Sequence, residues 1–556
     1  MINKFKNKTL IGLVAFVLVS GLMLSFTLKN DKLFTIAKNL DIFASLVREL
    51  DSYYVDEIDA EELVTVGINA MLEELDPYTE YIPEENADDF RLLTTGEYAG
   101  VGALIGNRTG KNMVLMPYKG FPAQAAGLRI GDEFLKVDSV NVQEKETADI
   151  SALLKGPANT SVTVQFKRGD DTLSVDLIRK KIVISNVPYY GKVDNQTGYI
   201  KLTDFTTNAA ADVRKALLDL KSQGITRLIL DVRDNPGGIL KEAVEIVNLF
   251  IPKGKEVVRT IGKLESVNSV YKTTKSPVDK DIPLVVLINE RSASASEIVA
   301  GALQDYDRAI LIGKKTFGKG LVQTSIPLSY NSQVKVTTAK YYIPSGRCIQ
   351  AIDYSKKDIA GNGSSIPDSL RNEFKTKNGR IVLDGAGIEP DTKTENKTYA
   401  PITYSLVARN HIFDFGNKFF IENKEIASPR EFEVSDEIYE DFVAWLEGKE
   451  YDYTTFVEKS IEDLEKYAEK EKYYEDIKNQ IEDLKKKVTH SKEQDLITFK
   501  DEVKEALEDE LISRYYYQEG VIEASLKNDP DIEQSLKVLA SPLEIKNILT
   551  ASTKKK

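Results

Sequence analysis

The stretch RLILDVRDNPGGIL (residues 227–240) decides the fold class of this chain. Its first half is a continuous apolar run, as expected for a strand buried on both faces of a parallel sheet. An Asn-Pro-Gly-Gly turn signal follows, and ILKEAVEIVNLFI (239–251) continues with the three- and four-residue apolar spacing of a helix. A buried strand, a tight turn and a helix in succession predict an α/β unit.

The flanking segments repeat this alternation. YIKLTDF (199–205) and PLVVLIN (283–289) have the composition of strands, whereas residues 208–224 and 295–306 have helical spacing. The first of these helices has an asparagine at its start and a glycine at its end, both typical helix boundaries. We therefore predict an α/β domain over residues 185–400.

Composition excludes several classes of function. The chain has 556 residues and a formal net charge of −13, and nucleic acid is disfavoured as the main partner because phosphate binding needs a basic surface. The length is enough for three or four domains of about 150 residues. The only cysteine, Cys348, excludes an intrachain disulfide, and with only His411 and His490 we expect no metal site and no cofactor.

The N-terminus carries a predicted membrane segment. Three lysines precede TLIGLVAFVLVSGLMLSFTL (residues 9–28), a run long enough to span a hydrocarbon core of about 30 Å as a helix. The basic flank predicts a cytoplasmic N-terminus, with everything after residue 31 exported to the periplasmic side of the cell envelope. No small-residue cleavage site follows, so residues 1–30 are interpreted as a cytoplasmic stub and an inner-membrane anchor. A cleaved signal peptide is the alternative.

Helical segments are predicted at both ends of the exported body. Residues 31–95 show helical apolar spacing that breaks at Asp76-Pro77. Residues 401–556 are helical and strongly charged, with interspersed glutamates and lysines typical of a solvated helical array. This extension contains no chemical motif, so we interpret it as a scaffold or a partner-binding surface.

Residues 96–184 change to short alternating strands, namely MVLMPY (113–118), SVTVQF (161–166) and TLSVDLI (172–178). Together with the glycine-rich YAGVGALIG (98–106), this order resembles a PDZ domain of the bacterial protease type. The resemblance implies a loop whose backbone N–H groups capture a chain-terminal carboxylate. Its residues would be Gly100, Val101, Gly102 and Ala103. A β module without a ligand is the alternative.

Two further stretches carry candidate chemistry. NERSASASEIVAGAL (289–303) places three serines among small residues at a helix start, where N–H groups can receive developing negative charge. Helix capping is the alternative role for Ser292 and Ser296. The Gly237-Gly238 turn before the helix over residues 239–251 could also supply an oxyanion hole, although tight-turn chemistry alone explains such a pair.

The segment LIGKKTFGKGLVQTSIPL (311–328) contains G-x-x-x-x-G-K, most of a phosphate-binding loop. However, Gly320 stands where Ser or Thr should ligate magnesium, and the segment continues as a strand. Both histidines lie far downstream, so a Ser–Lys pair is the simpler hypothesis for activating a serine. Lysine acts as a base only when an apolar environment lowers its pKa of about 10.4. Lys319, between two glycines and near Phe317, is the candidate.

Taken together, SASASEI, FGKGxVQ and DVRxNPGG in a chain with a PDZ-like module resemble the carboxyl-terminal processing proteases, a family of Ser-Lys endopeptidases (peptidase family S41). The resemblance covers roughly residues 35–395. It implies Ser294 as nucleophile, Lys319 as general base and Gln323 as the residue that orients the lysine. The implied oxyanion donors are the Ala295 amide and an amide of Gly237 or, preferably, Gly238, and the implied supporting residues are Arg233, Glu297 and Asp305.

The resemblance also implies a crotonase-like or Clp-protease-like α/β core with an inserted PDZ domain, and dimer contacts through the early helices. The implied activity is an acyl-enzyme endopeptidase that cleaves exported proteins at or near accessible C-terminal tails, with the PDZ domain gating the site. A non-enzymatic PDZ adaptor with an inactive core is the main alternative, and a phosphate-loop NTPase is the least favoured one.

Overall fold

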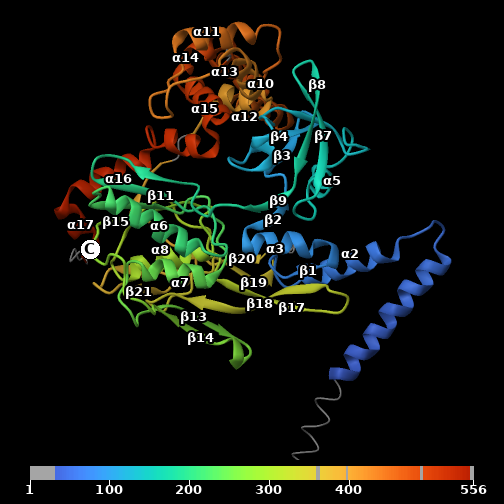
Figure 1. The fold of residues 1–556 in the computed structure, drawn as a ribbon, viewed down its shortest axis with the longest axis vertical. Helices are drawn as coiled ribbons and strands as arrows, with labels where there is room; N and C mark the ends of the chain where they lie inside the picture. The colour runs from blue at the N-terminus through green and yellow to red at the C-terminus, as the bar shows by residue number, and fades with distance from the viewer. Residues whose placement is uncertain (1–31, 358–362, 396–397, 489–491, 551–556) are drawn as a thin grey trace, which may run out of the picture. The chain divides into compact units, whose positions relative to one another are not determined.

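The computed structural model of the protein describes residues 32–357, 363–395, 398–488 and 492–550. Within these, unit 1 comprises the residues up to Ile82 together with Ser325–Val336, and unit 2 comprises the remainder (Figure 1). The predicted membrane segment at 9–28 lies outside the described residues. Of the helices that are described, none combines the length and the apolar character needed to cross a bilayer.

Unit 1 is helical over most of its N-terminal part, as predicted, and also contains a short pair of strands. It contains a helix over residues 32–53, α2 (Ala60–Glu73) and β1 (Glu80–Ile82), which pairs antiparallel with residues 333–335. The Asp59 carboxylate caps α2 by accepting hydrogen bonds from two backbone N–H groups of its first turn. Large apolar side chains of this unit remain exposed, among them Leu33, Phe34, Ile36, Leu40, Phe43, Val66 and Met71.

In unit 2, residues 97–183 form the predicted PDZ-like domain, and each predicted strand is present. Its sheet has the order β3-β4-β5-β7-β8, with β6 paired to β5, and a separate ribbon joins β2 to β9. The elements are β2 (Glu97–Gly100), β3 (Ala103–Arg108), β4 (Lys111–Pro117), α4 (Pro122–Ala125), β5 (Glu133–Val137), β6 (Val140–Asn141), α5 (Thr147–Leu154), β7 (Ser161–Arg168), β8 (Asp171–Ile178) and β9 (Lys180–Val183). The short helix α3 (Ala87–Thr95) precedes them.

The α/β core contains a six-stranded sheet in the order β10-β11-β12-β15-β16-β23, parallel except for β10. Its strands are β10 (Tyr189–Lys192), β11 (Thr197–Lys201), β12 (Arg227–Asp231), β15 (Leu284–Ile288), β16 (Ile310–Gly313) and β23 (Thr392–Lys393). Its helices are α6 (Ala209–Ser222), α7 (Leu240–Asn248) and α8 (Ala295–Asp305).

Antiparallel strands and short hairpins complete the core. They are β13 (Glu256–Gly262), β14 (Ser269–Lys272), β17 (Leu321–Pro327), β18 (Gln333–Tyr342), β19 (Ile352–Lys357), β20 (Gly363–Ser365), β21 (Glu373–Lys375) and β22 (Ile381–Leu383). The segment after Lys319 therefore continues as a strand, β17, rather than as the helix that a phosphate-binding loop requires.

Both faces of the six-stranded sheet are buried, and side chains alternate between them as strand geometry demands. Leu228 and Leu230 of β12 point to the face covered by α6, α7 and α8, whereas Ile229 points to the other face. That second face is covered by Ile532, Val538 and other residues of α16 (Pro530–Ala540) and α17 (Pro542–Leu549). Figure 1 shows these two C-terminal helices, in red, beside β11 and β15.

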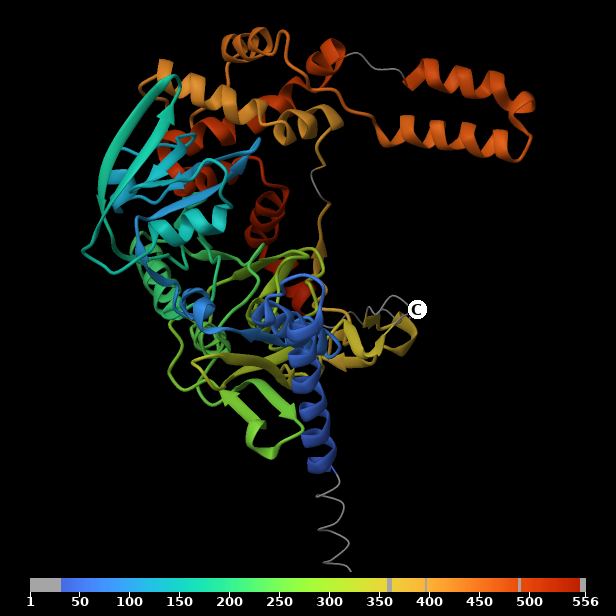
Figure 2. The same ribbon diagram turned by 90° about the vertical axis from the view of Figure 1, so that its right-hand side faces the viewer.

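The C-terminal extension is therefore not one solvated array. A first group of helices has its own apolar core: α9 (Pro401–Ala408), α10 (His411–Glu422), α11 (Asp436–Trp445), α14 (Lys492–Thr498) and α15 (Lys500–Ser525). The helices α12 (Phe456–Lys470) and α13 (Tyr474–Val488) form a hairpin, orange in Figure 2, that packs on itself. The last two helices, together with Ile522 and Leu526 at the C-terminal end of α15, belong to the core of the α/β domain.

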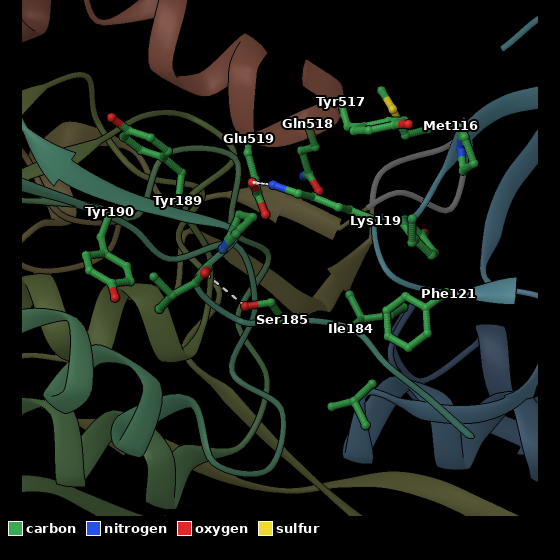
Figure 3. Close-up of a pocket in the computed structure, with 15 residues that line it drawn as sticks. Met116, Lys119, Phe121, Ile184, Ser185, Tyr189, Tyr190, Tyr517, Gln518 and Glu519 are labelled. Atoms are coloured by element: carbon green, nitrogen blue, oxygen red, sulfur yellow. Dashed lines mark hydrogen bonds and ion pairs between the residues drawn. The ribbon is translucent and has the colours of Figure 1, made fainter. Parts of the chain in front are cut away.

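The extension also contacts the PDZ-like domain. Phe413 of α10 packs with Met113 and Ile130, and Lys119 forms an ion pair with Glu519 of α15 at 2.9 Å. Figure 3 shows this ion pair on the wall of a pocket of about 460 Å³. Residues 116–121 of the PDZ-like domain, residues 183–190 from the end of β9 to the start of β10, and residues 517–519 of α15 line this pocket.

Candidate active site

The three sequence motifs of the α/β core meet at one edge of its sheet. The Asp231 end of β12 leads into residues 233–238, the Gly-Gly turn; β15 leads into the serine segment; and β16 leads into the Lys319 segment. These three strands are parallel neighbours, so their carboxyl ends lie together, where ligand sites of open α/β sheets form.

Ser294 stands out among the three serines. Ser292 and Ser296 are buried, and their hydroxyls donate to the carbonyls of Val232 and Asn235 at 2.8 and 2.9 Å. Ser294 is only half-buried, and its backbone has a φ of 54° and a ψ of −111° immediately before α8. A strained non-glycine residue at a helix start is typical of an exposed nucleophile. Ser292 and Ser296 therefore have structural roles, but neither is the helix cap that the alternative proposed, because the N-cap of α8 is Ser294 itself.

The Gly-Gly turn lies directly against Ser294. A Cβ atom on Gly237, which has a φ of +104°, would stand 2.8 Å from the Ser294 Cβ and 2.9 Å from the Ala295 nitrogen. Only glycine fits such an approach. The structure thus brings together the predicted nucleophile and the predicted oxyanion donors.

Asn235 holds this turn in place, and its importance was missed from the sequence. The side chain is fully buried, donates to the Leu202 carbonyl at 2.9 Å and accepts from the Gly237 N–H at 2.9 Å. Its own carbonyl accepts from the Ala293 N–H at 3.0 Å. The Gly237 N–H is thus already hydrogen-bonded, which leaves the N–H groups of Gly238 and Ala295 as the candidate oxyanion donors. The asparagine in the Asn-Pro-Gly-Gly signal could have indicated this side-chain turn.

Glu297 connects the nucleophile segment to the lysine segment. One carboxylate oxygen, Oε2, accepts from the Ser294 N–H at 2.8 Å and from the Lys319 N–H at 2.9 Å. The other oxygen accepts from the Thr316 hydroxyl at 2.5 Å and from the Gly318 N–H at 2.8 Å. The predicted supporting residue therefore fixes both backbone positions at once.

Tyr341 of β18 makes a second connection between these segments, also missed from the sequence. Its buried hydroxyl donates to the Ser294 carbonyl at 3.2 Å, and its N–H donates to the Gly320 carbonyl at 3.0 Å. The Gly320 N–H in turn donates to the Gln350 side chain at 2.7 Å. Lys319 is thus held from both sides, and its side chain is half-buried.

The other predicted residues are placed as follows. The Gln323 side chain, on β17, donates to the Thr337 hydroxyl at 3.1 Å. Asp305 lies at the far end of α8, about 16 Å from Ser294 at 1.5 Å per residue, where it pairs with Arg347 at 2.9 Å. Asp305 therefore supports the fold of α8 rather than touching the site.

Arg233, at the start of the Gly-Gly turn, pairs with the fully buried Asp231 at 2.7 Å. Burial alone would raise the pKa of Asp231, but the charges of Arg233 and Lys201 outweigh it and hold the pKa well below its usual range.

His411 contacts the Glu450 carbonyl within the extension at 2.7 Å. His490 lies outside the described residues.

The predicted carboxylate loop of the PDZ-like domain borders a groove of about 250 Å³. Val101 and Ala103 line it together with Ile105 of β3 and Ser151 of α5. Gly102 has a φ of +77°. The groove thus lies between a strand edge and a helix, as peptide addition to a sheet requires.

We expect Glu297→Gln to lower turnover about tenfold or more at pH 8. In the wild type both carboxylate oxygens accept hydrogen bonds, whereas in the variant one of them is replaced by an NH₂ group that faces donors and cannot accept from them. Burial raises the pKa of Glu297 to about 7, with the four hydrogen bonds opposing that rise. The ionised carboxylate, which accepts all four hydrogen bonds, therefore forms only as the pH rises through 7. The ratio of wild-type to variant rates, measured from pH 6 to pH 8.5, should grow with pH.

The exposed Glu290, just upstream in the same loop, provides the control. Glu290→Gln should show a flat ratio of rates over the same pH range. An equally flat ratio for Glu297→Gln would contradict the assigned role of its carboxylate.

Three family models match the chain. They describe Peptidase family S41 over residues 196–360, a PDZ domain over 114–168, and the C-terminal helical domain of PDZ-proteases over 402–539. The first two correspond to the α/β core and the PDZ-like domain described above. The third corresponds to the extension.

Individual relatives agree with these matches. A carboxy-terminal-processing protease of Bartonella bacilliformis is 36% identical over 321 residues, which cover 57% of this chain and 73% of that protein. A CtpA-like serine protease of Staphylococcus aureus strain N315 is 36% identical over 313 residues, covering 56% of this chain and 62% of the relative. A solved photosystem II D1 C-terminal processing protease is 31% identical, covers 59% of this chain and 91% of its own, and has a TM-score of 0.34.

The chain belongs to peptidase family S41, the carboxy-terminal-processing proteases. The resemblance and the fold class predicted from the sequence are thereby confirmed, including the PDZ domain and the helical C-terminal domain. The matched region spans 62% of the length of the staphylococcal relative.

Proposed function

We propose that the protein is a serine endopeptidase in which Ser294 and Lys319 form the catalytic dyad. The observation that carries this proposal is the Glu297 carboxylate, whose single oxygen Oε2 binds the backbone N–H of both residues. The close approach of Gly237 to Ser294 and Ala295 supports one site shared by the proposed nucleophile, base and oxyanion donors. An inactive PDZ adaptor would not need a strained Ser294 backbone, and strain of this kind persists where function requires it.

The residues support an acyl-transfer mechanism. Neutral Lys319 accepts the Ser294 hydroxyl proton as Oγ attacks the scissile carbonyl carbon. The Gly238 and Ala295 N–H groups donate to the oxyanion, and the N-terminus of α8 favours its negative charge. Collapse of this intermediate breaks the C–N bond, and Lys319 returns the proton to the leaving amine. Lys319 then takes a proton from a water that attacks the acyl carbon, the bond to Ser294 Oγ breaks, and the lysine returns the proton to Oγ.

Two assays test the proposal. One measures cleavage of an unfolded protein with an accessible C-terminal tail, and the other measures labelling by a phosphonate probe. We expect cleavage of the unfolded protein that EDTA does not inhibit, and a phosphonate adduct that mass spectrometry maps to Ser294. An adduct on another residue, or cleavage that survives in Ser294→Ala, would refute the dyad.

We further propose that the PDZ domain binds substrate C-termini and gates the site. Asn186, three residues after β9, is buried and accepts from the Thr206 N–H at 2.9 Å, and its carbonyl accepts from the Thr203 N–H at 2.9 Å. Phe205 lies between Thr203 and Thr206 in the sequence. Its N–H donates to the Gly237 carbonyl, and its own carbonyl accepts from the Ile239 N–H. A movement of β9, the last strand of the PDZ-like domain, would therefore be transmitted through Asn186 and Phe205 to the Gly-Gly turn.

We expect a peptide with a free C-terminal carboxylate to change the rate of hydrolysis of a small activated ester, because binding at the 100–103 loop displaces the PDZ domain. The amidated peptide should bind at least about tenfold more weakly, since it lacks the charge that the loop amides receive. In Asn186→Ala the peptide acid should still bind, measured by calorimetry, but should change the ester rate less. Equal binding of acid and amide would contradict the carboxylate assignment.

The sequence around the N-terminus supports two more proposals. Leu33, Ile36, Leu40 and Phe43 repeat at alternating spacings of three and four on the 32–53 helix and are exposed, which fits a coiled-coil seam between two copies. Residues 9–28 would anchor this dimer in the inner membrane, with the catalytic body on the periplasmic side. Sedimentation of residues 32–556 and cell fractionation of the full chain test the two proposals separately.

A further inference from the structure

The C-terminal extension reaches the Gly-Gly turn through one arginine. Besides Asp231, the Arg233 guanidinium pairs with two carboxylates of the extension, Asp529 at 2.7 Å and Asp531 at 2.8 Å. These side chains are at most 16% exposed. Charge-assisted hydrogen bonds that are largely shielded from water are among the stronger polar contacts in proteins.

Helix α16 fixes the positions of both carboxylates. Asp529 caps the helix by accepting from the Asp531 N–H at 2.8 Å, and Asp531 lies in the first turn. Ile532 and Val538 are buried against the six-stranded sheet, whose edge carries the active site. The extension therefore holds Arg233 from a rigid position on the same sheet.

Arg233 is in turn tied to the backbone of the Gly-Gly turn. Its N–H donates to the Asp231 carboxylate at 2.8 Å, and its carbonyl accepts from the Lys201 ammonium at 2.9 Å. The N–H of Asp234, the next residue, donates to the Asn289 side chain at 3.0 Å. A displacement of Arg233 would therefore move the turn that lies against Ser294.

We propose that Asp529 and Asp531 are positioning residues of the active site, which hold the Gly-Gly turn through Arg233 in the place that oxyanion stabilisation requires. The proposal rests on the peptidase activity proposed above. It gives the extension a part in turnover, although the extension lies outside the predicted core of residues 185–400.

The test uses Asp531→Asn in the full-length protein, because Asp531 pairs with Arg233 and its side chain does not cap the helix. We expect kcat for a small activated ester to fall about tenfold while KM changes less than about twofold, since oxyanion contacts form in the transition state. Asp531→Glu should restore part of the rate. Glu533→Gln is the matched control, because Glu533 lies on the same helix in an exposed pair with Lys537.

A second measurement keeps the proposal independent of the assay. In a Ser294→Ala background, amides of residues 230–240 should exchange hydrogen faster in Asp531→Asn than in Glu533→Gln. Equal kcat and equal exchange in the two variants would overturn the positioning role. Should the wild type hydrolyse neither ester nor protein, the peptidase proposal fails, while the exchange comparison still decides whether Asp531 holds the turn.

Discussion

Ser294→Ala and Lys319→Met should each lower kcat/KM for an unfolded test protein by at least about 1,000-fold. Without the hydroxyl no acyl-enzyme forms. Without the amine nothing takes the hydroxyl proton at neutral pH. Methionine keeps most of the lysine length without its charge, and the backbone contacts of residue 319 to Glu297 do not involve the side chain. The unfolding temperature of both variants should therefore stay within a few degrees of the wild type.

The exposed Lys315 offers a control for loss of charge in the same loop. Lys315→Ala should keep its rate within about twofold of the wild type. If Lys319→Met kept wild-type turnover at neutral pH, another group would be the base and the dyad assignment would be wrong.

Deletion of residues 530–556 should prevent the α/β core from folding in soluble form. The deletion removes Ile532, Val538 and Leu539, each nearly fully buried, and exposes Ile229 and Val285 of the sheet. Burial of one such side chain stabilises by about 1.5–3 kcal/mol, and typical total stabilities are about 5–15 kcal/mol. The exposed apolar sheet face should also aggregate. The soluble fraction and the light scattering of the purified protein measure the outcome.

Replacement of residues 456–488 by a short Gly-Ser linker is the control for this deletion. The α12–α13 hairpin packs around its own small core of Ile461, Ala468 and Ile481, so the rest should remain folded and soluble. Ile532→Ala provides a milder probe that should still fold, with a loss of about 2–5 kcal/mol in the free energy of unfolding. A soluble, active protein lacking 530–556 would show that the extension is separable.

Several parts of the site could be predicted because their signals are local. The Asn-Pro-Gly-Gly turn, the small residues around Ser294 and the glycines around Lys319 each lie within a few positions of one another. The family motifs then selected Ser294 and Lys319. The bonds from Glu297 to Lys319 and from Tyr341 to Ser294 have no such signal. They depend on how α8, the Lys319 segment and β18 pack together.

The sequence alone determined the α/β class, the PDZ-like strands and the helical ends, because hydrophobic periodicity and turn residues act over a few positions. Only the tertiary structure decided which serine is exposed, and that α16 covers the second face of the sheet and holds Arg233. Arg233 and Asp531 are 298 positions apart. An ion pair over such a separation depends on the packing of an entire helix against the sheet, which no local pattern of residues specifies.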